Sequence, residues 1–410
     1  MAPNVTQSQK LLKSPANWIF FILILIGLGA FLAGLSGGHP ERAWQTYLIN
    51  FLLWSAIAQG ALVFSAAMHV TNARWSGPLA GIADAFAAFF PFSFALYLVL
   101  ILGKSHIFPW LHQDLGGKEV WLNFPFLYTR DGIGLLLLYG FGIVYIYYDL
   151  QLRVVQKESN DRIRKFIFRR WNRRRLEPRL IKRKMSIFGV LYILAFALVL
   201  SLIGYDLIMS MEPAWISTLF GAYIFVKAFY IGLGGVIITA AILHLRLGKD
   251  SAFLPTHFHD IGKLFFAFCL LWADFFYVQL VVIWYGNISE EASFVIDRTV
   301  FAPWKNLAWI VFSVCFIAPF IILLNKRIKT RPVLMMLLSA VVIVGIWLEH
   351  LLLLGPALSH DATSLPLAIS DGLISFGFLG LMVLAVHFFL RRFPEIALIN
   401  QQIRVKDSAA

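Results

Sequence analysis

The chain has 410 residues, of which 60% are hydrophobic and only 14% are charged, and its formal net charge is +13. This composition excludes a soluble globular protein and predicts an integral membrane protein. No segment shows the alternating apolar and polar residues of barrel strands, so backbone groups within the bilayer must be satisfied in helices. The predicted fold class is therefore all-α and polytopic.

Apolar runs long enough to cross about 30 Å of hydrocarbon recur about ten times along the chain. They fall near residues 16–36, 44–70, 79–102, 131–150, 186–209, 216–246, 260–286, 303–324, 332–355 and 371–391. The first run is too long for the hydrophobic part of a signal peptide, so we expect a retained helix. The loops between runs are too short for an independent soluble core.

Lysine and arginine alternate in density from one loop to the next. Most of the 35 lie in the N-terminus, the C-terminus and the loops 71–78, 151–185, 247–259 and 325–331. The positive-inside rule then predicts that both termini are cytoplasmic. The positive charge is thus a topology signal and does not indicate nucleic-acid binding. The densest run, at 164–184, is expected to anchor anionic lipid headgroups or to dock an acidic partner.

The cysteines give no metal-binding pattern. Cys269 and Cys315 both lie inside predicted spans, without the Cys-X-X-Cys or Cys/His spacing of a metal site. We therefore expect no iron–sulfur cluster, covalent haem or structural zinc, and any redox centres must belong to partners or to a diffusible carrier. A weaker alternative is that His69, His244 and His387, which lie at similar depth, supply ligands to a b-type haem.

Ionisable residues inside the spans are functional candidates, because charge is costly in hydrocarbon. Candidates near the predicted cytoplasmic side are His69, Asp84, Asp149, His244 and His387, and those near the opposite side are Asp131, Asp206, Glu349 and His350. A lone histidine at a helix end is more often satisfied by a carbonyl or a headgroup than used in chemistry.

Lys227 and Asp274 are predicted at matching depths on sequential antiparallel spans, roughly 15 Å from the outer boundary. One interpretation is a buried ion pair in which each charge compensates the other. A second is that Asp274 belongs to a chain of proton-carrying groups that links the two sides. A direct contact between Asp274 and a ligand is the third.

Four segments carry a resemblance to a known family. They are YLINFLLWSAIAQGALVFSAAMHVTNARW (47–75), FPFLYTRDGIGLLLLYG (124–140), YDLIMSMEPAWISTLFGAY (205–223) and HDIGKLFFAFCLLWADFFYVQLVVIWYGNISEE (259–291). Over most of its length the chain resembles the ActF family of membrane subunits from bacterial alternative complex III. That complex is a quinol:cytochrome c (or high-potential acceptor) oxidoreductase, and its large membrane subunits are similar to the NrfD/PsrC family of polysulfide reductases.

The resemblance implies two four-helix bundles, at residues 44–209 (with the basic loop 151–185) and 216–355. The first span with the N-terminal tail (1–43) and the last span with the C-terminal tail (356–410) would flank them. A parallel repeat about an axis along the membrane normal is also implied. The expected location is the bacterial cytoplasmic membrane.

The resemblance also implies partners that hold the redox centres. They are a multihaem cytochrome c, an iron–sulfur subunit related to molybdopterin enzymes, a monohaem cytochrome c, the NrfD-like sister subunit ActC and small membrane subunits. Haem c and iron–sulfur clusters would then lie in these partners. This chain itself is expected to hold no covalently bound cofactor, and quinone and phospholipid are the ligands open to it.

In the sister subunit and related proteins, quinol oxidation is associated with a histidine on the helix matching 44–70 and an aspartate early on the helix matching 131–150. Here Gln59 stands where the histidine is expected, and Asp131 remains. Glutamine cannot accept a proton from quinol at physiological pH. This departure favours a non-catalytic subunit over a quinol-oxidising one.

The preferred interpretation is therefore a subunit that contributes a proton path and structural support. Its predicted inner groups are His69, Asp84, Asp149 and His244, its middle groups are Lys227 and Asp274, and its outer groups are Asp206, Glu349, His350 and Asp131. One alternative is a subunit with its own quinone site near Gln59 and Asp131. Another is a solitary ion-coupled transporter, which midplane charges and an internal repeat would suit.

Overall fold

The computed structural model describes residues 17–38, 40–154, 162–173, 176–248, 251–358 and 364–398. This described part is helical and contains no strand, which confirms the all-α prediction. It includes ten helices long and apolar enough to cross a membrane, as expected of a multi-pass membrane protein. The two tails predicted to be cytoplasmic, up to residue 16 and from residue 399, lie outside the described residues.

The ten spans follow the hydropathy of the sequence closely. They are α2 (Asn17–Ser36), α3 (Pro40–Val70), the segment Arg74–Ile107, α7 (Phe124–Arg153), α9 (Pro178–Leu207) with the short helix η5 (Met209–Met211), α10 (Phe220–Leu247), α11 (Pro255–Gly286), the segment Trp304–Leu324, α16 (Pro332–Leu358) and α17 (Ile369–Arg392). Besides the span of α9 and η5, two further spans are composite. Arg74–Ile107 contains η1 (Arg74–Ser76), α4 (Gly77–Ala85), η2 (Phe86–Phe89), α5 (Phe90–Val99), η3 (Leu100–Gly103) and α6 (Lys104–Ile107), and Trp304–Leu324 contains α13 (Trp304–Phe312), η7 (Ser313–Ile317) and α14 (Ala318–Leu324).

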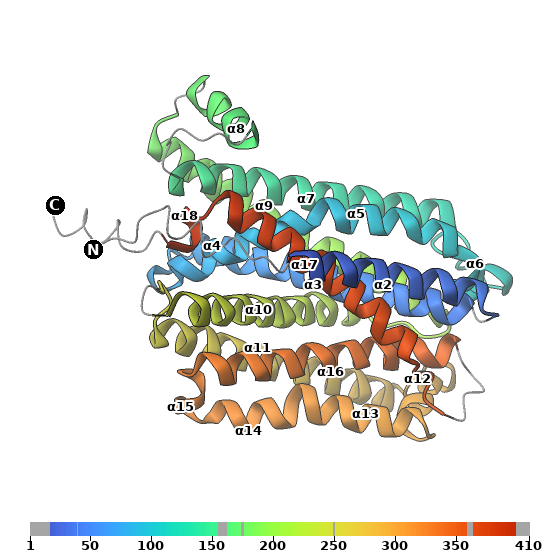
Figure 1. Cartoon of the computed structure of the whole chain (residues 1–410). Helices are drawn as coiled ribbons and strands as arrows, with labels where there is room; N and C mark the ends of the chain where they lie inside the picture. Colours follow the sequence, from blue (N-terminus) through green and yellow to red (C-terminus); the bar gives the residue numbers. More distant parts are fainter. Residues whose placement is uncertain are drawn as a thin grey trace.

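Two groups of spans lie side by side (Figure 1). The first bundle consists of α3, Arg74–Ile107, α7 and α9, and the second consists of α10, α11, Trp304–Leu324 and α16. The helices α3 and α10 join them at a close backbone approach: a Cβ on Gly60 would collide with the carbonyl of Ala228, and one on Gly232 would collide with the backbone of Gly60. The residue ranges predicted for the two bundles, 44–209 and 216–355, stay a prediction.

The first and last spans, α2 and α17, pack against each other and cover the first bundle. Gly27 and Gly377 allow this contact, since a Cβ on Gly27 would lie 2.6 Å from the Cα of Gly377. Asp371, near the start of α17, accepts hydrogen bonds from Arg42 (2.8 Å) and Thr46 (2.9 Å) of α3. These contacts attach the peripheral pair to the first bundle.

Two prolines inside spans free carbonyl groups, and both carbonyls find side-chain donors. Pro319 cannot donate to Cys315, whose carbonyl accepts a hydrogen bond from the Tyr230 hydroxyl at 3.2 Å. Pro356 cannot donate to Leu352, whose carbonyl accepts one from the guanidinium of Arg298 at 3.1 Å. The bilayer requirement for satisfied backbone groups is therefore met by side chains of neighbouring helices.

Arg298 belongs to a surface helix, α12 (Ser289–Thr299), which lies across one end of the second bundle. Its guanidinium also bonds Glu212 at 2.5 Å, in the segment that follows α9. Burial lowers the pKa of this guanidinium, and the Glu212 carboxylate opposes that shift. We call this end of the molecule, where α12 and the 108–123 loop lie, the α12 end.

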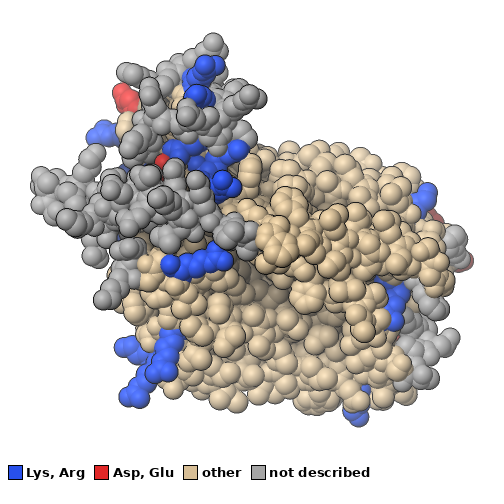
Figure 2. All heavy atoms as spheres, in the orientation of Figure 1, with Lys and Arg blue, Asp and Glu red and all other residues tan. Residues whose placement is uncertain are grey.

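The opposite end, which we call the basic end, holds α8 (Arg162–Arg173), α15 (Lys326–Lys329) and α18 (Glu395–Leu398). Lysine and arginine side chains lie at the ends of the molecule and leave the apolar body between them nearly free (Figure 2). Part of the basic loop forms α8, where Arg164 bonds Glu395 at 2.6 Å and Trp171 is buried. The loop is thus held to the body through these two side chains.

Candidate functional site

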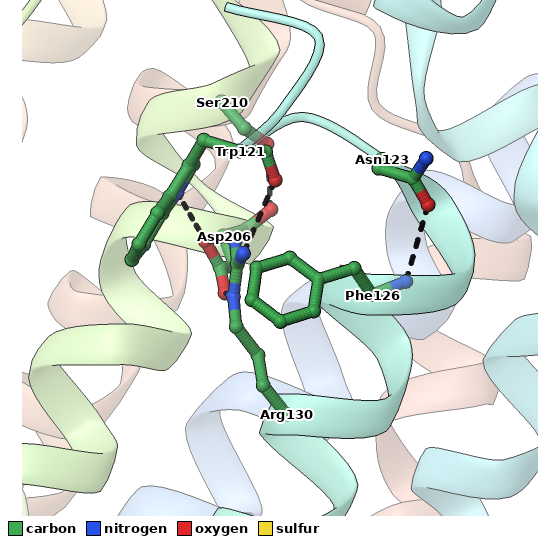
Figure 3. Close-up of polar contacts among 6 residues, drawn as sticks. All are labelled: Trp121, Asn123, Phe126, Arg130, Asp206 and Ser210. Atoms are coloured by element: carbon green, nitrogen blue, oxygen red, sulfur yellow. Dashed lines mark hydrogen bonds and ion pairs between the residues drawn. The ribbon is translucent and has the colours of Figure 1, made fainter.

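An arginine–aspartate pair lies at the α12 end of the first bundle (Figure 3). Asn123 caps the start of α7 by accepting from the amide of Phe126 at 3.3 Å, which places Arg130 in the second turn. Arg130 makes two hydrogen bonds to the carboxylate of Asp206 on α9, at 2.5 and 2.6 Å. The indole of Trp121 lies under the guanidinium, 3.8 Å from it, and donates to Asp206 at 3.2 Å.

A second carboxyl group lies beside this pair. Asp131 is fully buried and lies within hydrogen-bonding reach of the Asp206 carboxyl group, and no basic side chain among the described residues forms an ion pair with it. Arg130 can balance one negative charge, and it is used by Asp206. Asp131 is therefore a buried acid without a counter-ion of its own.

The same arrangement occurs at the basic end. Arg153 bonds Asp149 at 2.6 Å, one turn earlier on α7, and also donates to the carbonyl of Gly77 at 3.0 Å. Asp84 on α4 is fully buried and lies close to the Asp149 carboxyl group and to Ser65, and no basic side chain among the described residues forms an ion pair with it. Each end of the first bundle thus combines one arginine–aspartate ion pair with one additional buried aspartate.

A polar cavity of about 450 Å³ opens at the basic end and reaches this cluster. Ser65, His69 and Arg153 are among the residues that line it. Ser65 exchanges a hydrogen bond with the hydroxyl of Tyr145 at 3.1 Å, and His69 exchanges one with Ser186 at 3.1 Å. His69 is thus at the entrance to the cluster, bonded to a serine of α9.

A third polar group lies halfway along the first bundle. The amide of Gln59 donates to the hydroxyl of Tyr139 at 3.1 Å, that hydroxyl bonds Ser93 at 2.7 Å, and Ser93 bonds Ser55 at 2.5 Å. The Tyr192 hydroxyl donates to the backbone carbonyl of Gln59 at 3.1 Å. Four of these five side chains come from α3, α5 and α7, and Tyr192 comes from α9.

Helix α7 contributes to all three groups. Eight residues separate Asp131 from Tyr139 and ten separate Tyr139 from Asp149, or about 12 and 15 Å along the axis. Buried apolar residues such as Leu135 and Gly142 fill the turns between them. The first bundle therefore carries a column of buried polar groups interrupted by two apolar stretches.

The structure does not bring together the two residues predicted to bind quinone. Gln59 bonds Tyr139, which lies two turns of α7 away from Asp131. Asp131 instead adjoins Asp206, and Gln59 belongs to the hydroxyl cluster. A quinone site formed jointly by Gln59 and Asp131 is not supported by this geometry.

The predicted ion pair between Lys227 and Asp274 is wrong. Lys227 on α10 lies 3.2 Å from Glu349 on α16, both are buried, and the Tyr223 hydroxyl donates to the same carboxylate oxygen. Asp274 is exposed on the outer surface of α11. The rotation of α11 about its axis directs Asp274 away from the bundle, so it cannot reach Lys227.

The other predicted histidines are not part of the polar column. His244 exchanges a hydrogen bond with Ser251 at 2.9 Å, and His350 donates to the carbonyl of Ile346 at 2.8 Å. His387 is half-buried on the peripheral helix α17. Among the described residues, no group of three or more His, Cys, Asp or Glu side chains is placed to hold a metal ion.

Several members of these groups were missed by sequence reasoning. Arg130 and Arg153 lie just outside the predicted span 131–150, so neither is a candidate from the sequence. The four-residue spacing of Asp149 and Arg153 was an available signal for that pair, whereas the partner of Arg130, Asp206, is 76 residues away. Tyr139 and Ser93 gave no signal, because a tyrosine or serine within a span is common and its partners come from other helices.

An apolar pocket of about 480 Å³ lies at the α12 end of the second bundle. Aromatic side chains, including Trp215, Phe276 and Phe312, form much of its lining. Tyr223, which bonds Glu349, and Lys305 also line it. The pocket is suited to the hydrocarbon part of an amphiphile.

Comparison with protein-family models gives no match, and comparison with curated proteins gives no significant match.

Proposed function

We propose that this membrane protein is an ActF-like subunit of alternative complex III, a quinol:cytochrome c (or high-potential acceptor) oxidoreductase of the bacterial cytoplasmic membrane. In this proposal the chain does not oxidise quinol itself. It contributes a proton path and a scaffold beside an NrfD-like sister subunit, ActC. Electrons travel through the iron–sulfur subunit and the cytochromes c.

The observation that carries this proposal is the column of polar groups in the first bundle. Asp84 and Asp131 are acids without counter-ions, one near each end of the column. A carboxyl group can take a proton and release it, and neither of these two is held in an arginine–aspartate pair. The hydroxyls of Tyr139, Ser93 and Ser55 between them can relay a proton by exchanging hydrogen bonds.

The proposed path uses only helices of the first bundle, whereas the path predicted from the sequence also uses helices of the second bundle. Asp84, Asp149 and His69 remain at the basic end, and Asp131 and Asp206 remain at the other end. The Lys227–Glu349 pair and His350 lie in the second bundle, outside this column, and Asp274 faces outward. Water would have to fill the apolar stretches for protons to cross.

The proposal predicts that Asp84→Asn and Asp131→Asn each lower the number of protons moved per electron. An amide of similar size keeps the shape of the site but cannot ionise. The measurement is quinol-driven proton movement by the purified complex in proteoliposomes, followed with a pH-sensitive dye alongside the rate of quinol oxidation. We expect the proton ratio to fall toward that of quinol oxidation alone.

A matched control is Asp114→Asn, which changes an exposed carboxylate in the 108–123 loop that accepts only from the amide of Gly116. It should leave the proton ratio as in the wild type. An unchanged ratio in both Asp84→Asn and Asp131→Asn would refute the proton path. Loss of electron transfer in either variant would instead place that aspartate in the redox reaction.

A second candidate function is quinone binding. The aromatic pocket of the second bundle favours this function at a different place from the site predicted near Gln59 and Asp131. Tyr223 at its lining is bonded to the Glu349 carboxylate, so a headgroup there would lie near an acid. Extraction of quinone from the purified chain tests this. Stoichiometric quinone that is lost in Phe276→Ala would support it, and its absence would leave the proton path as the only function proposed.

A further inference from the structure

Asp274 lies at the centre of the longest helix and faces outward. It is exposed on α11 (Pro255–Gly286), eleven residues after Lys263 and eleven before Tyr285, so each of these two residues is about 16 Å away along the axis. The exposed residues on either side of it, Leu271 and Tyr277, are 41% and 59% exposed. No described residue forms a hydrogen bond or ion pair with Asp274.

An aspartate at this position is costly if lipid covers it. Charged side chains at the centre of a membrane-spanning helix are among the least favourable residues for insertion into the bilayer. Long basic side chains can reach the membrane surface from inside, but the short aspartate side chain cannot span about 16 Å. A donor that reaches Asp274 within the bilayer must therefore come from outside the described part of this chain.

The chain does not supply that donor to a second copy of itself. Lys227 is the cation at comparable depth among the described residues, and it is buried and bonded to Glu349. The exposed lysines of the second bundle, Lys263 and Lys305, lie toward the ends of their spans. Two copies facing each other through α11 would place one Asp274 against the other, which is repulsive.

We propose that this face of α11 packs against a membrane-spanning helix of a different protein, which places an arginine or lysine opposite Asp274 near the middle of the bilayer. The ion pair would offset the cost of both buried charges and fix the partner's depth. Leu271 and Tyr277, one turn before and after, would supply the apolar contact around it. This inference requires a membrane partner and is independent of whether that partner carries electrons.

The test is site-specific photocrosslinking of the full chain in its native membrane. A photoreactive amino acid is placed at Leu271 or at Tyr277, and a control is placed at Leu198, which is 70% exposed on α9 of the first bundle. We expect both α11 positions to crosslink to one partner helix, in a peptide with an arginine or lysine within one turn of the attachment point. The control position should not give that adduct.

Asp274→Leu should lower the yield of this adduct by about tenfold, which corresponds to losing about 1.4 kcal/mol of binding. Asp274→Glu should retain it, because the charge is kept. Exchanging the charges, with Asp274→Arg here and aspartate at the partner's basic residue, should restore the yield. The restored yield separates an ion pair from general damage to the helix.

Adducts to phospholipid alone, a partner peptide without a basic residue, or an unchanged yield in Asp274→Leu would each overturn the inference. Failure of this inference can be told apart from failure of the proposed function. A partner with the expected basic residue but no associated cytochrome would uphold the docking surface and refute the redox role.

Discussion

Lys227→Met is expected to lower the free energy of unfolding by about 3–5 kcal/mol, because it leaves the buried Glu349 carboxylate without its cation. Methionine fills much of the space of the lysine stem, so the loss reflects charge more than packing. Tyr223 still donates to one carboxylate oxygen, but the other has no partner among the described residues. The measurement is reversible unfolding of the purified chain in detergent.

Two double variants identify the partner of Lys227. Lys227→Met combined with Glu349→Leu should recover most of the lost stability, because it replaces the buried ion pair by apolar side chains. Lys227→Met combined with Asp274→Asn should be as unstable as Lys227→Met alone. Recovery with Asp274→Asn, and none with Glu349→Leu, would contradict the Lys227–Glu349 pairing.

Arg130→Met is the second change with a large expected effect. It removes both hydrogen bonds to Asp206 and the contact with the Trp121 ring, and it leaves two buried carboxyl groups side by side. We expect a loss of about 3–5 kcal/mol in the free energy of unfolding. The stability of Arg130→Lys should lie between that of the wild type and that of Arg130→Met. Lysine keeps the positive charge, but its ammonium group cannot make the bidentate contact with Asp206.

Adding Asp131→Asn to Arg130→Met should recover part of that stability, since one of the two acids is removed. Arg179→Met, which changes an exposed arginine on α9, is the control and should have little effect. Equal stability of Arg130→Met and Arg179→Met would show that the cluster at the α12 end is not an energetic unit.

The spans were predictable because a helix that crosses the bilayer needs a long apolar run, which hydropathy detects. The residues at which the helices begin and end were less predictable. The fourth span was predicted from residue 131, but α7 begins at Phe124, because an asparagine cap and a proline start the helix before its apolar part. That shift makes Arg130 a helix residue within hydrogen-bonding reach of Asp206 rather than a loop charge.

The side of a helix that faces the bundle was not predictable from the sequence. Helical rise predicts Lys227 and Asp274 at matching depth, but α11 carries large apolar residues on every side, so its sequence does not indicate which side faces the bundle. The true partner, Glu349, lies 122 residues away from Lys227. Contacts of that kind depend on the arrangement of all the helices, which single-sequence patterns do not contain.

The short surface helix α12 was not predicted, for a related reason. Helix α12 has only eleven residues and three acidic residues, so it has no hydrophobic run. Arg298 on it bonds a carbonyl freed by Pro356, and neither residue signals the other in the sequence. Such contacts become visible only once the spans are assembled.

The measurement that tests the central claim most directly is mass spectrometry of the proteins that co-purify with this chain after mild solubilisation of its native membrane. We expect a multihaem cytochrome c, a large iron–sulfur protein, a monohaem cytochrome c and an NrfD-like sister chain in a fixed ratio. Isolation of the chain alone, or only with copies of itself, would contradict a role in a respiratory complex and favour an ion-coupled transporter.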